Sequence, residues 1–324
     1  MKNEVSISMY HYTRDLAHSR YPNIKGLAYD LFEQQLQFFA AHFSVVTMEA
    51  VIHALEPDGK PLPEHALLLT FDDGYIDNFT VALPLLKKYG MQGSFFIPGK
   101  TFSENVLLDV NKIHFVLASA DNPKELVHDL FQLLDEARRG PEYRDIPDNE
   151  SLYARYAAAN RFDSAEIVFC KQMLQTVLPE KLRNEITSAL FARYVGQTEA
   201  NFARELYMNA DQISCLKANG MFIGLHGYDH YWLSELNKAD MERDIDKALE
   251  VMAPFINKEA WVMNYPYGVY NQNVIDYIQA RGCVLGLTTD VAKAELTAAD
   301  RYTLPRFDCN DFPPKSENYL KYQG

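Results

Sequence analysis

The sequence lacks the features that mark secreted and membrane proteins. Its first ten residues contain no apolar core of the roughly 7–15 residues that a signal peptide needs. No window approaches the about 18 consecutive apolar residues of a membrane span. The four cysteines show no C-x-x-C spacing, so we expect reduced thiols that serve mainly in packing: Cys170, Cys215, Cys283 and Cys309. We therefore expect a cytoplasmic protein with no membrane span.

Positive charge is also scarce. Lys and Arg total 31 and Asp and Glu total 44, which gives a formal net charge of −13. This balance argues against nucleic acid and against an anionic membrane surface as partners. It leaves room for a phosphate-bearing substrate, because a local pocket of Arg or Lys is enough to bind one.

Strand and helix patterns alternate near both ends of the chain. Seven short apolar runs are typical of strands, with helical spacing between them: residues 5–10, 44–46, 67–71, 94–97, 221–225, 260–264 and 283–288. This alternation predicts an α/β fold with parallel strands. The 324-residue length matches one α/β barrel with an insertion, although a doubly wound open sheet fits the pattern equally well. Residues 78–89 read as one helix, with Pro84 as a difficulty inside it.

Residues 103–205 have a different character. Glycine is scarce there, helical patterns dominate and strand-like runs are nearly absent. We interpret this stretch as a helical insertion within one domain, whose barrel is formed by residues 1–102 and 206–324. Its role is open between bulk with oligomer contacts and a lid or wall beside the site. Homo-oligomer formation is open for the same reason.

The most informative stretch is Leu67–Tyr75, in which an apolar run ends in Asp72, Asp73 and Gly74. Three consecutive leucines are typical of a strand covered on both faces, and α/β proteins build their sites at the C-terminal ends of such strands. Neighbouring strand residues face opposite sides, so both carboxylates enter one pocket only where the chain turns. Gly74 can supply that turn. The alternative is an Asp-Gly turn between two strands.

A second apolar run, from Met221, ends in His226 and His230. Two imidazoles separated by three residues can face one metal ion from a single turn of chain. Together with a carboxylate from the strand-end aspartates they form a two-histidine, one-carboxylate ligand set. Such a set leaves a coordination position for water, as catalytic zinc sites do.

These stretches resemble the motifs of a known family. Thr70-Phe71-Asp72-Asp73-Gly74 and His226-Gly-Tyr-Asp-His230 resemble the first two motifs of the NodB-like polysaccharide deacetylases, carbohydrate esterase family 4. Asn264-Tyr265-Pro266-Tyr267-Gly268 is similar to that family's Arg-x-Pro-Tyr-Gly motif, with Asn264 in place of the arginine. The resemblance covers roughly residues 5–100 and 205–310. It implies a distorted (β/α)7 TIM-like barrel, the NodB homology fold, and removal of an N-acyl group from an amino sugar.

The resemblance also implies roles for single residues. Asp73, His226 and His230 would bind a divalent metal, with Zn²⁺ as the expected ion. Asp72 would be the base that takes a proton from the attacking water, and the alternative is a carboxylate that orients a ligand histidine. The backbone N–H of Tyr267 would point at the developing oxyanion.

Further predictions concern the substrate and the general acid. We expect Tyr75, Pro266 and Arg306 to contact the substrate. Arg306 is also the candidate to tune Asp72, because the motif arginine is missing. No histidine follows His230, so the late Leu-x-His motif of most relatives is absent. A branch of the family carries its catalytic histidine after the first strand, and His11 matches that arrangement, so His11 is the expected acid.

We expect a cytoplasmic member of the family to act on a sugar precursor and not on finished polymer. We expect a nucleotide- or lipid-linked amino sugar of bacterial surface polysaccharide or O-antigen assembly, with acetyl as the leaving acyl group and formyl as the close competitor. The missing arginine and late histidine motivate an alternative, a non-catalytic carbohydrate-binding protein on the same fold. A metal-dependent phosphoesterase is weaker, because two-metal sites usually need more carboxylates.

One polar loop stays outside this scheme. Arg20, Tyr21 and Lys25 follow His11 and would suit a phosphate or carboxylate on the substrate. We favour a solvated loop.

Overall fold

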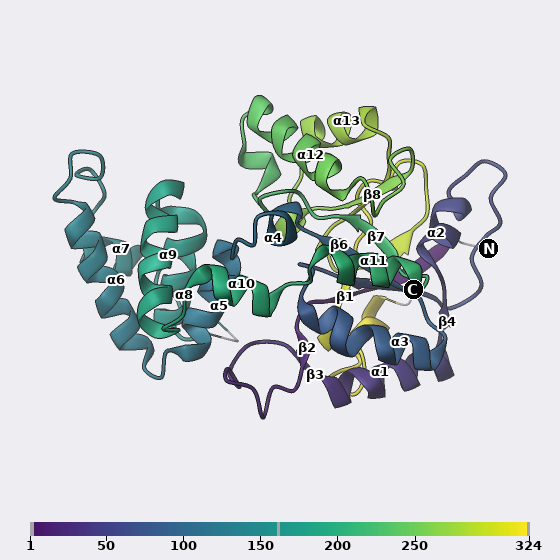
Figure 1. Cartoon of the computed structure of the whole chain (residues 1–324), viewed down its shortest axis with the longest axis horizontal. Helices are drawn as coiled ribbons and strands as arrows, with labels where there is room; N and C mark the ends of the chain where they lie inside the picture. The colour runs from purple at the N-terminus through teal and green to yellow at the C-terminus, as the bar shows by residue number, and fades with distance from the viewer. Residues whose placement is uncertain (1–2, 161–162, 323–324) are drawn as a thin grey trace. The chain divides into compact units, whose positions relative to one another are not determined.

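The computed structural model describes residues 3–160 and 163–322, and the chain forms two compact units. The first, called the sheet unit here, comprises Met1–Asp15, Gly26–Val106 and Ala203–Gly324. The second, the helical unit, comprises Leu16–Lys25 and Leu107–Phe202. Figure 1 labels their helices and several of their strands. The predicted domain organisation, in which residues 103–205 are a helical insertion within one domain formed by residues 1–102 and 206–324, stays a prediction.

The sheet unit is built on a run of six parallel strands. Their order in the sheet is β1-β5-β6-β7-β8-β9, and their bounds are β1 Glu4–Tyr10, β5 Ala66–Phe71, β6 Gly93–Ile97, β7 Phe222–Leu225, β8 Trp261–Asn264 and β9 Cys283–Leu287. Because all six run in one direction, their carboxyl ends meet at one edge of the sheet. The predicted α/β class is confirmed, in the form of a curled parallel sheet.

Short strands complete the sheet unit. The seventh predicted strand, β4 Ser44–Val45, lies parallel to the start of β5. β10 Ala294–Glu295 pairs antiparallel with β1, and β11 Phe307–Asp308 pairs parallel with it. β2 Thr13–Arg14 and β3 Leu27–Ala28 form a separate two-stranded sheet.

The C-terminal segment from Leu304 to Asp308 lies between β9 and β1. Thr288, just after β9, donates its backbone N–H to the Leu304 carbonyl at 2.9 Å, and Phe307 is paired with Ser8 of β1. Among the described residues no ladder joins β9 to β1 directly. This segment therefore fills the seam of the curled sheet, and Arg306 lies within it.

Successive side chains along each strand point to opposite faces of the sheet, so the sheet unit has two hydrophobic cores. On β5, Leu67, Leu69 and Phe71 belong to a large cluster shared with the covering helices, whereas Leu68 packs with apolar residues of the other strands, such as Val262 and Leu285. The whole of β5 is buried, as its run of leucines predicts. Thr70 and Asp72 continue the alternation of Leu68, which directs them to the same face.

Helices of the sheet unit connect successive strands. Their bounds are α1 Tyr29–His42, α2 Met48–Ala54, α3 Leu83–Tyr89, α4 Gly99–Ser103, α11 Ala210–Ala218, α12 Lys238–Met252 and α13 Gln272–Ala280, with short 3₁₀ turns at Leu233–Glu235, Pro266–Gly268, Cys309–Asp311 and Asn318–Tyr322. The predicted helix at residues 78–89 is a π-helical turn, Asn78–Ala82, followed by α3, so Pro84 lies in the first turn of α3, where it is tolerated. The side chain of Asn237 caps α12 by accepting the backbone N–H of Asp240.

The helical unit contains α5 Asp109–Ser119, α6 Pro123–Ala137, α7 Asn149–Tyr156, α8 Ala165–Gln172, a π-helical turn Met173–Val177 and α9 Glu180–Tyr194. The next helix, α10 Glu199–Leu206, runs from this unit into the sheet unit. All four cysteines are free thiols. Across the described ranges, no helix combines the length and apolar character needed to cross a membrane.

Candidate active site

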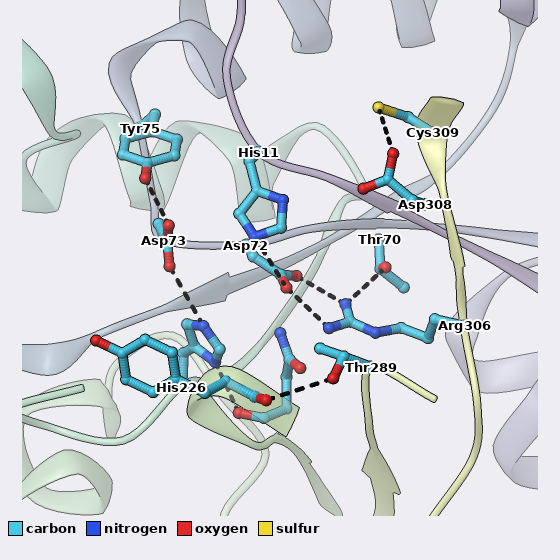
Figure 2. Close-up of polar contacts among 12 residues, drawn as sticks. His11, Thr70, Asp72, Asp73, Tyr75, His226, Thr289, Arg306, Asp308 and Cys309 are labelled. Atoms are coloured by element: carbon cyan, nitrogen blue, oxygen red, sulfur yellow. Dashed lines mark hydrogen bonds and ion pairs between the residues drawn. The ribbon is translucent and has the colours of Figure 1, made fainter. Parts of the chain in front are cut away.

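The two aspartates lie just past the end of β5, where the chain turns. Asp73 has φ 69° and Gly74 has φ 68°, so the left-handed turn begins at Asp73 and not at Gly74 as predicted. A Cβ on Gly74 would lie 2.8 Å from the Cγ2 atom of Ile97, which adds a second reason for glycine there. The turn separates the two carboxylates: Figure 2 shows Asp73 beside His226 and Asp72 beside Arg306.

Asp73, His226 and His230 converge on one point. The Oδ1 atom of Asp73 lies 3.3 Å from Nε2 of His226 and 3.3 Å from Nε2 of His230. Two ligands held at about 2.1 Å from a tetrahedral metal ion are about 3.4 Å apart, so both distances match a metal-binding geometry. Within the described residues, this buried Oδ1 atom also receives no hydrogen bond. The three side chains therefore fit a divalent cation.

Neighbouring groups orient two of these side chains. Nδ1 of His226 lies 2.7 Å from the backbone carbonyl of Asn264, at the end of β8, which directs Nε2 toward Asp73. The Tyr75 hydroxyl donates to Oδ2 of Asp73 at 2.5 Å, which leaves Oδ1 facing the histidines. Burial alone raises the pKa of Asp73, but the imidazoles of His226 and His230 hold it well below its usual value.

The loop that carries His230 is fixed from α12. The buried carboxylate of Asp244 accepts the backbone N–H groups of Tyr228 at 2.9 Å and Asp229 at 2.8 Å. Lys100 forms an ion pair with the side chain of Asp229. His230 itself has φ 57°, an uncommon conformation for a residue other than glycine. These contacts hold it in a backbone conformation that local preference disfavours.

Asp72 is held by Arg306. Nη1 and Nη2 of the guanidinium donate to the two oxygens of the carboxylate at 2.8 Å each, a bidentate pair, and Nη1 also donates to the Thr70 hydroxyl at 3.1 Å. Nε donates to the carbonyl of Thr288 at 2.8 Å, so every contact of Arg306 faces inward. Burial raises the pKa of Asp72, but the charge and hydrogen bonds of Arg306, together with the nearby imidazoles of His11 and His226, outweigh it, so the pKa is lowered. Asp72 therefore stays ionised.

His11 faces Asp72 from the segment after β1. Its Nε2 atom lies 3.8 Å from Oδ2 of Asp72, and its side chain is 39% exposed, against 3% for Asp72. It is thus more accessible than the buried groups around it, and Figure 2 shows it beside Asp72. Its role as the general acid stays a prediction.

The third motif lies beside His230. Pro266 is buried, and Tyr267 adopts φ 58° in the turn that follows β8. The ring of Tyr267 packs edge-on against His230 at 4.8 Å and stacks on Trp232 at 4.6 Å with an interplanar angle of 18°. Trp232 and Tyr267 are both half-buried.

Two predicted substrate contacts are placed elsewhere. Tyr75 is fully buried between the rings of Tyr12 and Tyr207, and its hydroxyl is used on Asp73. Arg306 is also fully buried, on Asp72. Neither has surface to offer a sugar, which corrects the prediction, whereas the alternative for Arg306, tuning of the base, agrees with its contacts.

Sequence reasoning missed three residues of the site. Thr70 lies within the first motif, but its hydroxyl was given no role. Asp244 gave no local signal, because it lies in a helix with ordinary amphipathic spacing. Trp232 follows His230 by two residues, and that proximity was the available clue.

Comparison with known proteins identifies the family. The family model for polysaccharide deacetylase matches residues 59–133 and 162–285, and the chain belongs to this family. YxkH of Bacillus subtilis (strain 168) is 44% identical over 59 residues, which cover 18% of this chain. That match spans about a fifth of the relative's length, 21%.

Solved structures support the same fold. The Streptococcus pyogenes deacetylase PplD, in complex with acetate, has a TM-score of 0.59 at 18% identity and covers 100% of both chains. The de-N-acetylase from Aggregatibacter actinomycetemcomitans has a TM-score of 0.56 at 16% identity and covers 98% of this chain and 100% of its own. The deacetylase domain of BpsB from Bordetella bronchiseptica has a TM-score of 0.55 at 13% identity, with coverage of 94% and 96%. The predicted NodB-type fold is confirmed.

Proposed function

We propose that this chain is a metal-dependent hydrolase that removes an N-acyl group, acetyl in the first instance, from an amino sugar. The observation that carries the proposal is the position of Asp73 Oδ1, 3.3 Å from both imidazole Nε2 atoms, with an ionised Asp72 next in the chain. Asp73, His226 and His230 would hold the metal. A divalent ion there, with Zn²⁺ as our expectation, would supply a Lewis acid that lowers the pKa of water and polarises the acyl carbonyl.

The remaining groups divide the proton transfers between them. Asp72, kept ionised by Arg306, would accept a proton from the attacking water. As the amide C–N bond breaks, His11 would give a proton to the leaving amine, which its exposed position beside Asp72 allows. The products are a carboxylic acid and an amino sugar. In this proposal Tyr267 contributes its backbone N–H to the oxyanion.

A sugar would contact the site through aromatic surface. Trp232 and Tyr267 form a half-buried stacked pair next to His230. Aromatic faces suit the apolar C–H face of a sugar ring and add little conformational cost, since the stack already fixes both rings. We propose this pair, rather than Tyr75 or Arg306, as the main sugar contact, with Pro266 fixing the turn.

The decisive experiment measures acetate and free amine together. Metal-loaded protein is incubated with N-acetylated oligosaccharides and with nucleotide- and lipid-linked N-acetylated sugars, and with their N-formyl counterparts. We expect equimolar acetate and amine. The substrate that is hydrolysed fastest in this panel tests whether the protein acts on a nucleotide- or lipid-linked precursor. Faster release of formate than of acetate would show that the protein is a deformylase.

A non-catalytic carbohydrate-binding protein is the competing function. Its motivation, the missing arginine at Asn264, is weakened because Arg306 binds Asp72 from another segment. Sugar binding with no acid released from any substrate in the panel, by protein shown to contain metal, would favour this alternative and refute the hydrolase.

A further inference from the structure

The helical unit contains a cavity that the candidate active site does not use. Its volume is about 430 Å³, within the roughly 300–1,000 Å³ typical of small-ligand sites. It is lined by α5, α8, the π-helical turn after α8 and the loop before Gly26, through Asn23, Lys25, His114, Leu117, Ala118, Ala120, Asp163, Ile167, Lys171 and Gln175. All of these residues belong to the helical unit.

The loop Leu16–Lys25 is anchored where it forms the rim. Tyr21 packs edge-on against Phe115 at 4.9 Å and Phe202 at 5.7 Å, and Ile24 is buried. This packing holds the backbone of the loop beside the cavity, while Arg20 and Lys25 stay exposed, as the predicted solvated loop requires. The facing wall includes the π-helical turn Met173–Val177, a rare conformation that is frequent at functional sites.

Two ammonium groups share one carboxylate at the rim. Asp163 accepts from Nζ of Lys25 at 2.7 Å and from Nζ of Lys171 at 2.6 Å. The side chain of Asp163 is 11% exposed, whereas Lys25 is 66% and Lys171 is 27% exposed. One carboxylate neutralises one ammonium, which leaves an excess positive charge here in a chain of net charge −13. Because Lys25 is mostly in water, it can turn toward an added anion at little cost.

Apolar side chains form another part of the lining. Leu117, Ala118 and Ile167 line the cavity, as does Gln175. A matching ligand would pack its carbon skeleton against these apolar side chains. Its hydroxyls would hydrogen-bond to Gln175, and its anionic group would bind the two lysines. We propose that this cavity is a second ligand site, which binds a sugar-sized anion, a sugar that carries a phosphate or a carboxylate, through Lys25 and Lys171.

Calorimetric titration tests the assignment with three probes: glucose 6-phosphate, glucuronate and uncharged glucose. Each is titrated into the full chain and into chelator-treated chain, because an anion bound to a metal in the active site would be lost on chelation. We expect both charged probes to bind with and without chelation, and glucose to bind at least about tenfold more weakly than either.

Matched variants locate the binding. In Lys25→Gln/Lys171→Gln the affinity for the charged probes should fall about tenfold or more, whereas Lys181→Gln, which removes an exposed lysine paired to Glu142 in the same unit, should leave it unchanged. Hydrolysis of a small N-acetylated substrate should be equal in all three proteins. Absence of binding, binding insensitive to the double substitution, or equal binding of glucose would overturn the proposal, and Lys25–Asp163–Lys171 would be only a structural link.

Discussion

Two ion pairs, one in each unit, show what burial does to a charge. Arg306 and Asp72, in the sheet unit, are 0% and 3% exposed, and the arginine makes all of its contacts inside the protein. Lys181 and Glu142, in the helical unit, are 65% and 55% exposed and touch through a 3.0 Å contact on the surface. Bulk water solvates the exposed partner that remains when the second pair is broken, whereas breaking the first pair leaves a buried charge unpaired. We therefore expect the Arg306–Asp72 ion pair to be essential for stability and the Lys181–Glu142 ion pair to contribute little to it.

The largest expected effect is at the proposed metal. His226→Ala removes one of three ligands, and with it the Lewis acid, whose contribution of several kcal/mol corresponds to a fall in turnover of about 10³-fold or more. Bound metal, measured by elemental analysis, should fall in parallel. His53→Ala, at an exposed histidine whose side chain pairs with Glu56, is the control and should change neither. Full metal content in His226→Ala would show that His226 is not a metal ligand.

The next effect is at the buried pair. Arg306→Met leaves the buried Asp72 carboxylate without the cation that both of its oxygens contact, so the free energy of unfolding should fall by about 3–5 kcal/mol. Turnover should fall as well, because burial then disfavours the ionised base. Chemical denaturation and an acetate-release assay measure the two. Arg306→Lys keeps the charge without the bidentate contact and should lie between. A variant as stable and active as the parent would show that Asp72 does not depend on Arg306.

A smaller effect is expected at the aromatic pair. Trp232→Ala should raise KM by about 2–10-fold with little change in kcat, because stacking contributes to binding and not to proton transfer. Trp232→Phe should retain most of the affinity. The chain has two tryptophans, and Trp261 is fully buried, so quenching of fluorescence by a sugar reports on Trp232. Quenching that persists in Trp232→Phe would place the sugar elsewhere.

The smallest effect completes the comparison. Lys181→Gln should change the free energy of unfolding by no more than about 0.5 kcal/mol, since the pair is exposed on both sides. Denaturant titration beside Arg306→Met measures the contrast. A loss at Lys181 comparable to that at Arg306 would mean that burial does not separate the two pairs.

The sequence predicts those features of the site that depend on residues close together in the chain. It does not predict features that depend on contacts between distant residues. Hydrophobic runs are local, and the seven strands and the polar residues at their ends, Asp72 with Asp73 and His226 with His230, follow from them. The contact of Arg306 with Asp72 depends on pairing between the C-terminal segment and β1, about 300 residues apart in the chain, which no local pattern encodes.

Backbone conformation is a second limit on prediction. Asp73, His230 and Tyr267 all have positive φ, which side chains other than glycine disfavour. Local preference opposes these conformations, so tertiary contacts such as those of Asp244 must hold them. The prediction that Tyr75 contacts substrate failed for a related reason, because residue type and motif position do not reveal burial between two other tyrosines.

The central claim is that two adjacent aspartates have different duties, and one paired measurement tests it. Bound metal and turnover are determined side by side for Asp72→Asn and Asp73→Asn. Asp72→Asn should keep its metal and lose about 10²–10⁴-fold in turnover, as expected for a missing general base. Asp73→Asn should lose both. Equal metal content with equal activity in the two variants, or loss of metal in Asp72→Asn alone, would contradict the account.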